Sequence, residues 1–346
     1  MGLTSDIVLD VSKFDLSQIT PETTGILSVL EQLTSSAPSW QKVGAAQYRA
    51  LRDTGGTPLP PRVFLPAAKD LTFPSRDPNR TIPIRLYTPD NGHPTRGIIL
   101  HAHGGGFVLG THQDQDASLQ RYANTCQLTA LSVGYRVAPE DPWPAAVHDV
   151  FDVATHLVDN GQSLFNAPLL FIVGESAGAT LVAQAAFHIA RERPEHRLAG
   201  VILPYGWFDL TLNLPSIQDF KRELIINTNS MRGYADAYVP GMSIEERTNP
   251  LISPLYDGLL RLEAEMGDPK KKKKALPPAL FLCGTADPLL DDTLLMSAKW
   301  MASGSQAVVK IFNGAPHGFT VVPGYSLAAE ASEVVFEFIK GRLGEL

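Results

Sequence analysis

The sequence predicts an α/β fold, in which a mostly parallel central sheet is flanked by helices. Short apolar runs typical of buried strands alternate along the chain with longer stretches of helical periodicity. Of the 346 residues, 44% are hydrophobic, which is enough to bury a substantial core. The sequence contains no internal repeat, and α/β folds of this length commonly form one unit, so we expect a single central sheet.

The alternating part of the chain accounts for seven strands and five helices. The first strand is expected at 82–87, where apolar and polar residues alternate; the others are expected as apolar runs near 97–102, 129–135, 169–173, 199–204, 278–283 and 307–312. Helical periodicity lies between or after them, around 115–127, 145–160, 178–192, 291–303 and 327–341.

Two regions fall outside this alternation. Residues 1–60 carry two amphipathic patterns, one around Leu27 and Leu30 and one around Trp40 and Tyr48. Residues 211–275 separate two expected strands and have apolar residues of their own. Both regions are therefore expected to form helices that pack on the sheet domain.

The most informative motif is Gly174-Glu175-Ser176-Ala177-Gly178, which follows an apolar run and precedes a helical pattern. A serine at a sharp strand-to-helix turn is pushed out of the sheet, and the flanking glycines let the backbone approach its neighbours. The start of the helix also offers unpaired N–H groups and a positive dipole end. The five-residue pattern alone also fits an ordinary turn, so Ser176 is a candidate nucleophile for acyl transfer that requires partners.

A second motif supplies candidate donors for an oxyanion hole. The expected strand at 97–102 continues into His103-Gly104-Gly105-Gly106-Phe107. Three consecutive glycines are costly in conformational entropy, so we interpret Gly104, Gly105 and Gly106 as a loop whose amides turn toward a developing negative charge. The amide of Ala177 is the expected further donor, and a plain flexible turn is the alternative.

The candidate base is His317, which follows the expected strand at 307–312. Catalytic groups cluster in loops at the ends of the strands in such sheets. The other histidines downstream of Ser176 are His188 and His196, and both lie on or near the helix that follows this serine. Neither can easily fold back onto it.

The candidate acid is Asp287, the first carboxylate after the expected strand at 278–283. It would hold the imidazole of His317 in the required tautomer and stabilise the imidazolium. Asp291 and Asp292 remain alternatives, although both are placed where a helix start favours aspartate.

Six short segments agree with one known family and occur in its order, over roughly residues 80–320. They are 103–107, 135–140, 142–146 with Asp149, 174–178, 287–291 and 317–319. The order serine, aspartate, histidine is also that of α/β-hydrolases. The chain thus resembles the hormone-sensitive-lipase-like branch of the α/β-hydrolases, which includes plant carboxylesterases and arylacetamide deacetylases.

The resemblance implies an α/β-hydrolase fold and a serine esterase with the triad Ser176, Asp287 and His317. It implies that the amides of Gly105 and Gly106, with that of Ala177, form the oxyanion hole. The histidine at 103 has a structural role in the family. Ala179 stands where the family often has glycine, a departure that touches no reacting group.

The resemblance also implies a helical cap over the catalytic serine. Residues 1–60 would be N-terminal cap helices and 211–275 a cap insertion, while 61–210 and 276–346 would form the catalytic core. The apolar make-up of the insertion suggests a hydrophobic acyl or alcohol group in the substrate. Possible pocket residues are Phe107, Trp207 and Phe208, with core packing as the alternative.

Composition narrows the range of partners. The net charge of −7 gives no indication of a nucleic-acid partner, and the basic run at 270–274 is expected to be a solvated loop. No run of 18 apolar residues predicts a membrane span, and without an apparent signal peptide the expected location is cytoplasmic.

Metal and disulfide chemistry are not expected. Cys126 and Cys283 fit a helix and a buried strand as ordinary core thiols. His101 and His103 form a His-x-His pair, but no glutamate or third histidine stands at ligand spacing nearby. We therefore expect neither a metal nor an organic cofactor.

These observations predict a serine carboxylic-ester hydrolase that acts through an acyl-enzyme on small to medium hydrophobic esters. The alternative is a biosynthetic lactonase, amidase, thioesterase or acyltransferase with the same triad. A non-catalytic ligand-binding protein is a further alternative, although gibberellin receptors of the family lack the histidine that this chain keeps at 317. The chain is expected to be a monomer or a homodimer.

Overall fold

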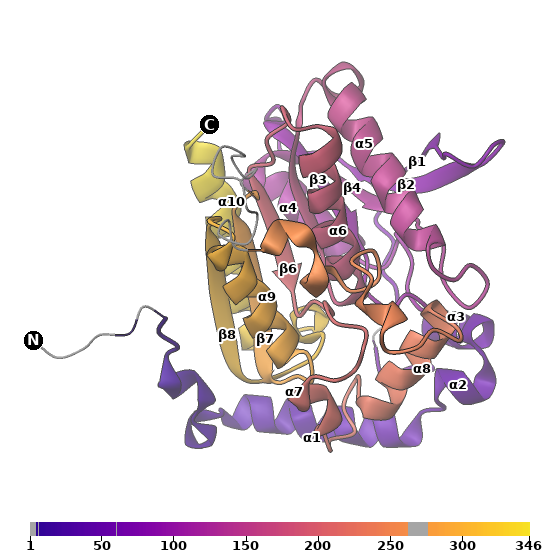
Figure 1. Cartoon of the computed structure of the whole chain (residues 1–346), viewed down its shortest axis with the longest axis vertical. Coiled ribbons are helices and arrows are strands. Elements are labelled where there is room, and N and C mark those ends of the chain that lie inside the picture. Colours follow the sequence, from indigo (N-terminus) through magenta and orange to yellow (C-terminus); the bar gives the residue numbers. More distant parts are fainter. Residues whose placement is uncertain (1–4, 6, 60, 262–275) are drawn as a thin grey trace, which may run out of the picture.

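An eight-stranded sheet forms the centre of the computed structural model, which describes residues 5, 7–59, 61–261 and 276–346 (Figure 1). The strand order is β1-β2-β4-β3-β5-β6-β7-β8. The strands are β1 (Lys69–Pro74), β2 (Thr81–Tyr87), β3 (Gly97–Ala102), β4 (Leu128–Val133), β5 (Leu169–Gly174), β6 (Gly200–Pro204), β7 (Ala279–Ala286) and β8 (Ala307–Pro316).

The sheet is parallel from β4 to β8, and the antiparallel pairs are β1 with β2 and β2 with β4. All seven expected strands are present, but β1 was not predicted. This edge strand contains Lys69, Asp70 and Pro74, and only Phe73 is buried in it. An edge strand needs to bury little apolar surface, so its sequence lacks a clear strand pattern.

Helices cover both faces of the sheet, as expected. One core cluster joins the sheet to α5 (Ala145–Phe165), α6 (Ala177–Glu192) and α9 (Leu290–Ala302). A second cluster joins it to α4 (Asp116–Cys126) and α10 (Ser326–Gly344). The result is the three-layer α/β-hydrolase architecture, in which α6 is buried over most of its length because it begins directly behind β5.

The remaining helices come from the two regions that fall outside the alternation. They are α1 (Pro21–Ser36), α2 (Trp40–Val43), α3 (Ala45–Asp53), α7 (Pro215–Gln218) and α8 (Thr228–Tyr238), and Figure 1 shows them gathered at the lower end of the sheet. Short 3-10 helices are η1 (Val11–Phe14), η2 (Leu16–Gln18), η3 (Glu246–Thr248), η4 (Pro254–Tyr256), η5 (Gly258–Leu260) and η7 (Phe319–Val321).

Local sequence explains where α1 begins and which side it buries. The side chain of Thr20 accepts a hydrogen bond from the amide of Thr23, and Pro21 occupies the first turn. Leu27 and Leu30 are buried, as the amphipathic pattern predicts. The division of the chain into cap and core stays a prediction, and the basic run at 270–274 lies outside the described residues.

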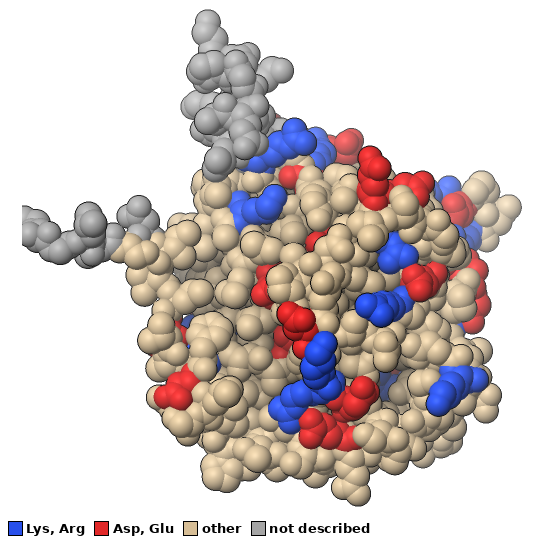
Figure 2. All heavy atoms as spheres, turned by 60° about the horizontal axis from the view of Figure 1, so that its bottom comes forward, with Lys and Arg blue, Asp and Glu red and all other residues tan. Residues whose placement is uncertain are grey.

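Both cysteines are free and buried, Cys126 in α4 and Cys283 in β7. None of the helices in the described ranges is long and apolar enough to cross a membrane. On the face drawn in Figure 2, basic and acidic side chains are intermixed. Opposite charges that lie close together do not create the single-sign field that attracts a polyanion to a surface.

Candidate active site

Ser176 stands at the turn between β5 and α6 with a backbone φ of 55°, a conformation rare for residues other than glycine. Such strain is typical of a nucleophile held out from a sheet edge. Close approach explains Gly178: a Cβ there would lie 2.0 Å from the carbonyl oxygen of Ala102 in β3. The Gly-x-Ser-x-Gly pattern thus reflects the tight packing of this turn against β3.

The structure brings together the three residues predicted as a triad. The Nε2 atom of His317 lies 2.9 Å from Oγ of Ser176, and its Nδ1 atom lies 2.9 Å from Oδ2 and 3.1 Å from Oδ1 of Asp287. Asp287 and His317 are 2% and 4% exposed. Water therefore competes little for these hydrogen bonds, and one tautomer of the imidazole satisfies both contacts at once.

The alternative acids are used elsewhere. Asp291 accepts a hydrogen bond from the amide of Ser216. Asp292 accepts hydrogen bonds from the amides of Phe208 and Asp209, and burial raises the pKa of its carboxyl well above the usual range. Of the three aspartates after β7, Asp287 is the one that contacts His317.

The glycine loop follows β3 and lines the same cavity as Ser176. Gly105 and Gly106 have φ angles of 120° and 62°, which turn the peptide groups away from strand geometry. In the described part of the chain, no backbone hydrogen bond uses the amides of Gly105, Gly106 or Ala177 as donors. Such amides are available to bind an anionic oxygen. A Cβ on Gly104 would lie 3.0 Å from the carbonyl oxygen of Glu175, so this position has no room for a side chain.

His103 supports the glycine loop from behind. Its Nδ1 atom lies 2.8 Å from the carbonyl oxygen of Gly104, and the hydroxyl of Tyr135 donates to the carbonyl oxygen of His103. Burial lowers the pKa of His103 to about 4, so its imidazole is neutral near pH 7. This contact pattern agrees with the structural role that the resemblance implies.

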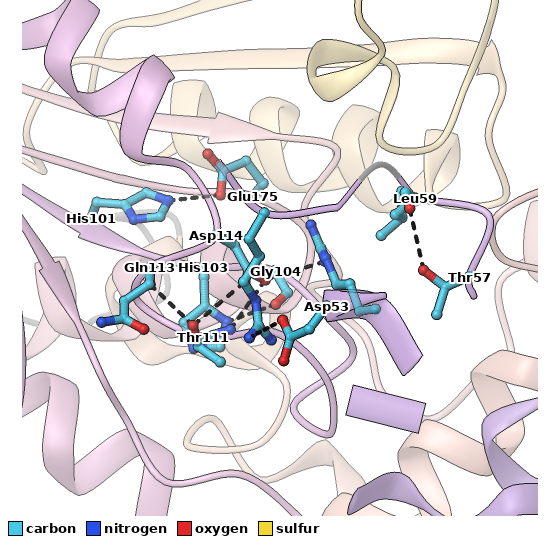
Figure 3. A network of polar contacts seen from close by, with 12 residues as sticks. Asp53, Thr57, Leu59, His101, His103, Gly104, Thr111, Gln113, Asp114 and Glu175 are labelled. Carbon is cyan, nitrogen blue, oxygen red and sulfur yellow. Dashed lines mark hydrogen bonds and ion pairs between the residues drawn. The ribbon is translucent and has the colours of Figure 1, made fainter. Parts of the chain in front are cut away.

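A separate polar network around Asp114 lies near this histidine, as Figure 3 shows. Asp114 accepts a hydrogen bond from the amide of Thr111 and forms ion pairs with Arg52 and Arg62. Its side chain is only 6% exposed. The network therefore ties the segment after α3 to the backbone that follows the glycine loop.

His101 points elsewhere, and its Nε2 atom lies 3.0 Å from Oε2 of Glu175 (Figure 3). Its Nδ1 atom lies 2.8 Å from the hydroxyl of Ser132. Both ring nitrogens of His101 are thus engaged by protein groups. Among the described residues, no group of three or more histidine, cysteine, aspartate or glutamate side chains is arranged to hold a metal ion.

A cavity of about 610 Å³ opens at Ser176 and His317. Apolar residues of the 211–275 region contribute to its wall, together with α3 and the segment after it. The contributing apolar side chains are Ile225, Ile226, Met231 and Tyr234. The volume lies within the range of small-molecule sites, so the cavity is large enough for an ester of moderate size.

Of the three possible pocket residues, Trp207 lines the cavity. The prediction was wrong for Phe107 and Phe208, which are fully buried in the core. The Phe107 ring stacks on Tyr238 with centroids 3.9 Å apart, and Phe208 meets the edge of Phe281. Aromatic residues beside a catalytic motif can pack in the core or line a pocket, so the sequence alone could not decide between these two positions.

Sequence reasoning did not single out Tyr205, the residue that follows β6. Its ring meets His317 edge-on, with centroids 4.8 Å apart, and its hydroxyl bonds to that of Thr320. It packs against the imidazole that bridges Ser176 and Asp287. The only indication of this role in the sequence was the position of Tyr205 directly after a buried strand, because this tyrosine belongs to no motif.

Comparison with known proteins agrees with this geometry. Residues 99–321 match the family described as alpha/beta hydrolase fold. The chain is 28% identical over 257 residues to an ethyl acetate hydrolase of Pseudomonas putida. The aligned stretch covers 72% of this chain and 74% of the relative.

Two solved structures extend the likeness over nearly the whole chain. The hyperthermophilic esterase of Pyrobaculum calidifontis has a TM-score of 0.69 and 28% identity, covering 91% of this chain and 93% of its own. An esterase of the bacterial hormone-sensitive lipase family has a TM-score of 0.73 and 23% identity. The match covers 94% of this chain and 99% of that esterase, and it shows that the two share a fold. The chain therefore belongs to the alpha/beta hydrolase fold family, as its resemblance to the hormone-sensitive-lipase-like branch predicted.

Proposed function

We propose that this protein is a serine carboxylic-ester hydrolase that acts through an acyl-enzyme on small to medium hydrophobic esters. The observation that carries the proposal is the continuous contact from Asp287 through His317 to Ser176 at the base of a cavity. The esterases among its relatives support the same reaction type.

Acylation follows from the contacts of His317. As Oγ of Ser176 attacks the ester carbonyl carbon, Nε2 of His317 takes the hydroxyl proton, and Asp287 stabilises the imidazolium. The amides of Gly105, Gly106 and Ala177 would bind the oxyanion, and each such donor typically contributes about 3–4 kcal/mol. The bond to the alcohol oxygen then breaks, and His317 gives its proton to the leaving alkoxide.

Deacylation repeats these steps with water as the nucleophile. His317 takes a proton from the water molecule as its oxygen attacks the acyl carbon. The bond between that carbon and Oγ breaks, the proton returns to Ser176, and the carboxylic acid leaves. No group other than the side chains and amides named here is required for proton balance.

The cavity wall supports the substrate class. Ile225, Ile226 and Met231 line it, as does Leu289, whose amide donates to Asp287. Apolar walls favour a hydrocarbon acyl or alcohol group because its burial gains roughly 0.8 kcal/mol per methylene. Affinity should therefore rise with acyl length until the chain exceeds the available volume.

The test is hydrolysis of p-nitrophenyl esters from acetate to dodecanoate by the wild type and by Ser176→Ala. We expect turnover that peaks at a short or medium chain and falls about 10⁶-fold in the variant, whose circular dichroism is unchanged. Near-normal turnover by Ser176→Ala would eliminate the proposed nucleophile.

Failure of the wild type on every ester would favour the alternative acyl-transfer chemistry. A folded protein that opens lactones, or that cleaves amides or thioesters, would keep the same triad with another substrate. The cytoplasmic location, the small-molecule partner and the choice between monomer and homodimer remain predictions.

A further inference from the structure

One side of the glycine loop is covered by an aromatic ring from α8. A Cβ built on Gly106 would lie 2.4 Å from Cγ of Tyr234 and 2.6 Å from its Cδ1 atom. The ring therefore occupies the space that a side chain at this position would need. Tyr234 is 8% exposed and also lines the cavity.

The next turn of the same helix makes a second contact with the loop. Tyr238 is four residues after Tyr234, so both rings project from one side of α8. Tyr238 stacks on Phe107, with ring planes inclined by 7°. Helix α8 thus contacts two consecutive loop residues, Gly106 and Phe107.

The far side of Tyr234 is covered by the N-terminal region. Trp40 of α2 stacks on it with centroids 5.2 Å apart and planes inclined by 15°. The neighbouring residue Gln41 lies against Gly233, where a Cβ would come within 2.5 Å of its Nε2 atom. Trp40 itself is not among the residues that line the cavity at Ser176.

Side-chain packing can hold the amides of Gly105 and Gly106 in place. Within the described residues, the amides of Gly105 and Gly106 donate no backbone hydrogen bond, while the amides of Val108 and Leu109 both donate to the carbonyl oxygen of Gly105. A donor stabilises an oxyanion only if it is already oriented toward it. A ring stacked on Gly106 restricts the rotation that would misorient its amide.

We propose that Tyr234 is a positioning residue for the glycine loop, and that Trp40 adjusts catalytic turnover through Tyr234 from outside the cavity. The proposal rests on the proposed function, because it assigns the loop amides to the oxyanion. The two predicted cap regions would then act on the chemical step as well as on substrate choice.

The experiment is a double-mutant cycle on the acylation rate and kcat for p-nitrophenyl butyrate. Tyr234→Ala should lower both by about 10- to 100-fold, somewhat less than the loss of a whole oxyanion donor. Trp40→Ala should lower kcat by about 3- to 10-fold with KM unchanged, and should cause no further loss in the Tyr234→Ala background, as expected for directly coupled residues.

Matched variants separate positioning from general destabilisation. Tyr234→Phe keeps the ring and should recover most of the lost rate, while Tyr234→Leu keeps apolar bulk without a flat ring and should not. Phe14→Ala removes an exposed aromatic residue of η1 that does not line the cavity, and should leave kcat unchanged. Rates are measured well below each variant's unfolding midpoint, so that loss of fold does not contribute.

The outcomes distinguish this proposal from the function on which it rests. If turnover disappears in Ser176→Ala but the acylation rate is unchanged in Tyr234→Ala, the positioning role is overturned and the proposed function stands. An unchanged kcat in Trp40→Ala, or losses that add fully in the double variant, would overturn the role of Trp40. A wild type that hydrolyses no ester would overturn both proposals. An effect of Trp40→Ala on KM alone would assign Trp40 to substrate binding and contradict the positioning role.

Discussion

At the scale of single residues, the site depends on a few atoms held in one arrangement. Ser176 has a strained backbone conformation, and Gly178 lets the turn pack closely against Ala102. His317 has a partner for each ring nitrogen. The sequence predicted this triad from motifs and their order, since each member lies just after an expected strand and the carboxyl ends of parallel strands meet at one edge of the sheet.

The first prediction concerns the acid. Asp287→Asn should lower kcat about 10⁴-fold with the fold unchanged, because an amide that donates to Nδ1 favours the wrong tautomer of His317. Steady-state hydrolysis of p-nitrophenyl butyrate measures the effect. Asp291→Asn is the matched control and should keep most of the activity, since Asp291 bonds to Ser216 instead. Equal losses in both variants would contradict the role of Asp287.

At the scale of elements, polar contacts fasten the N-terminal helices to distant parts of the molecule. In α1, Glu22 accepts hydrogen bonds from Ser326 at the start of α10, and Glu31 pairs with Arg222 of the 211–275 region. In the segment that ends α3, Arg52 pairs with Asp114. These contacts join residues far apart in the chain, so no local pattern could have predicted them.

The second prediction tests the anchor at Asp114. Asp114→Asn removes the carboxylate that the largely buried Arg52 and Arg62 share and leaves Arg62 paired with the more exposed Asp53. It should lower the free energy of unfolding by about 3 kcal/mol. Urea denaturation measures this change. Glu140→Gln breaks the more exposed pair with Arg49 in the same helix and should cost less than about 1 kcal/mol. Similar costs for the two variants would show that burial does not govern this anchor.

The sequence predicted the features that depend on local patterns and missed those that depend on contacts between distant residues. Strands β2 to β8 were predictable from an alternating pattern in β2 and from apolar runs in the others, whereas β1 was missed because its exposed edge position leaves only Phe73 buried. The triad was predictable from motifs and order. The stacking of Trp40 on Tyr234 was not, because 194 positions separate the two residues and neither belongs to a motif.

At the scale of the whole molecule, burial of histidine links folding to pH. Burial lowers the pKa of six of the nine histidines, which lie in helices and loops: His103, His112, His148, His156, His188 and His196. Each is easier to protonate in the unfolded chain than in the folded one. Where the unfolded state binds more protons, the free energy of unfolding rises with pH.

The last prediction follows for His103, the most buried of these residues. Its pKa is about 4 when folded and 6.5 in the reference state, so its stabilising effect is complete above pH 6.5 and is lost as pH falls toward 4. The total loss is on the order of 3 kcal/mol. His103→Asn should therefore flatten the dependence of unfolding free energy on pH by at most about 1.4 kcal/mol per pH unit between pH 4.5 and 6.

Urea denaturation of the wild type and His103→Asn at half-unit pH intervals measures this difference in slope. The buried carboxyl of Asp292 has the opposite effect on the pH dependence of the unfolding free energy. Because its pKa is raised, the folded state binds a proton more readily than the unfolded state above pH 3.8. It is present in both proteins, so its contribution cancels in the comparison. Parallel curves would mean that His103 is protonated equally in the folded and unfolded states, which its burial against the glycine loop should prevent.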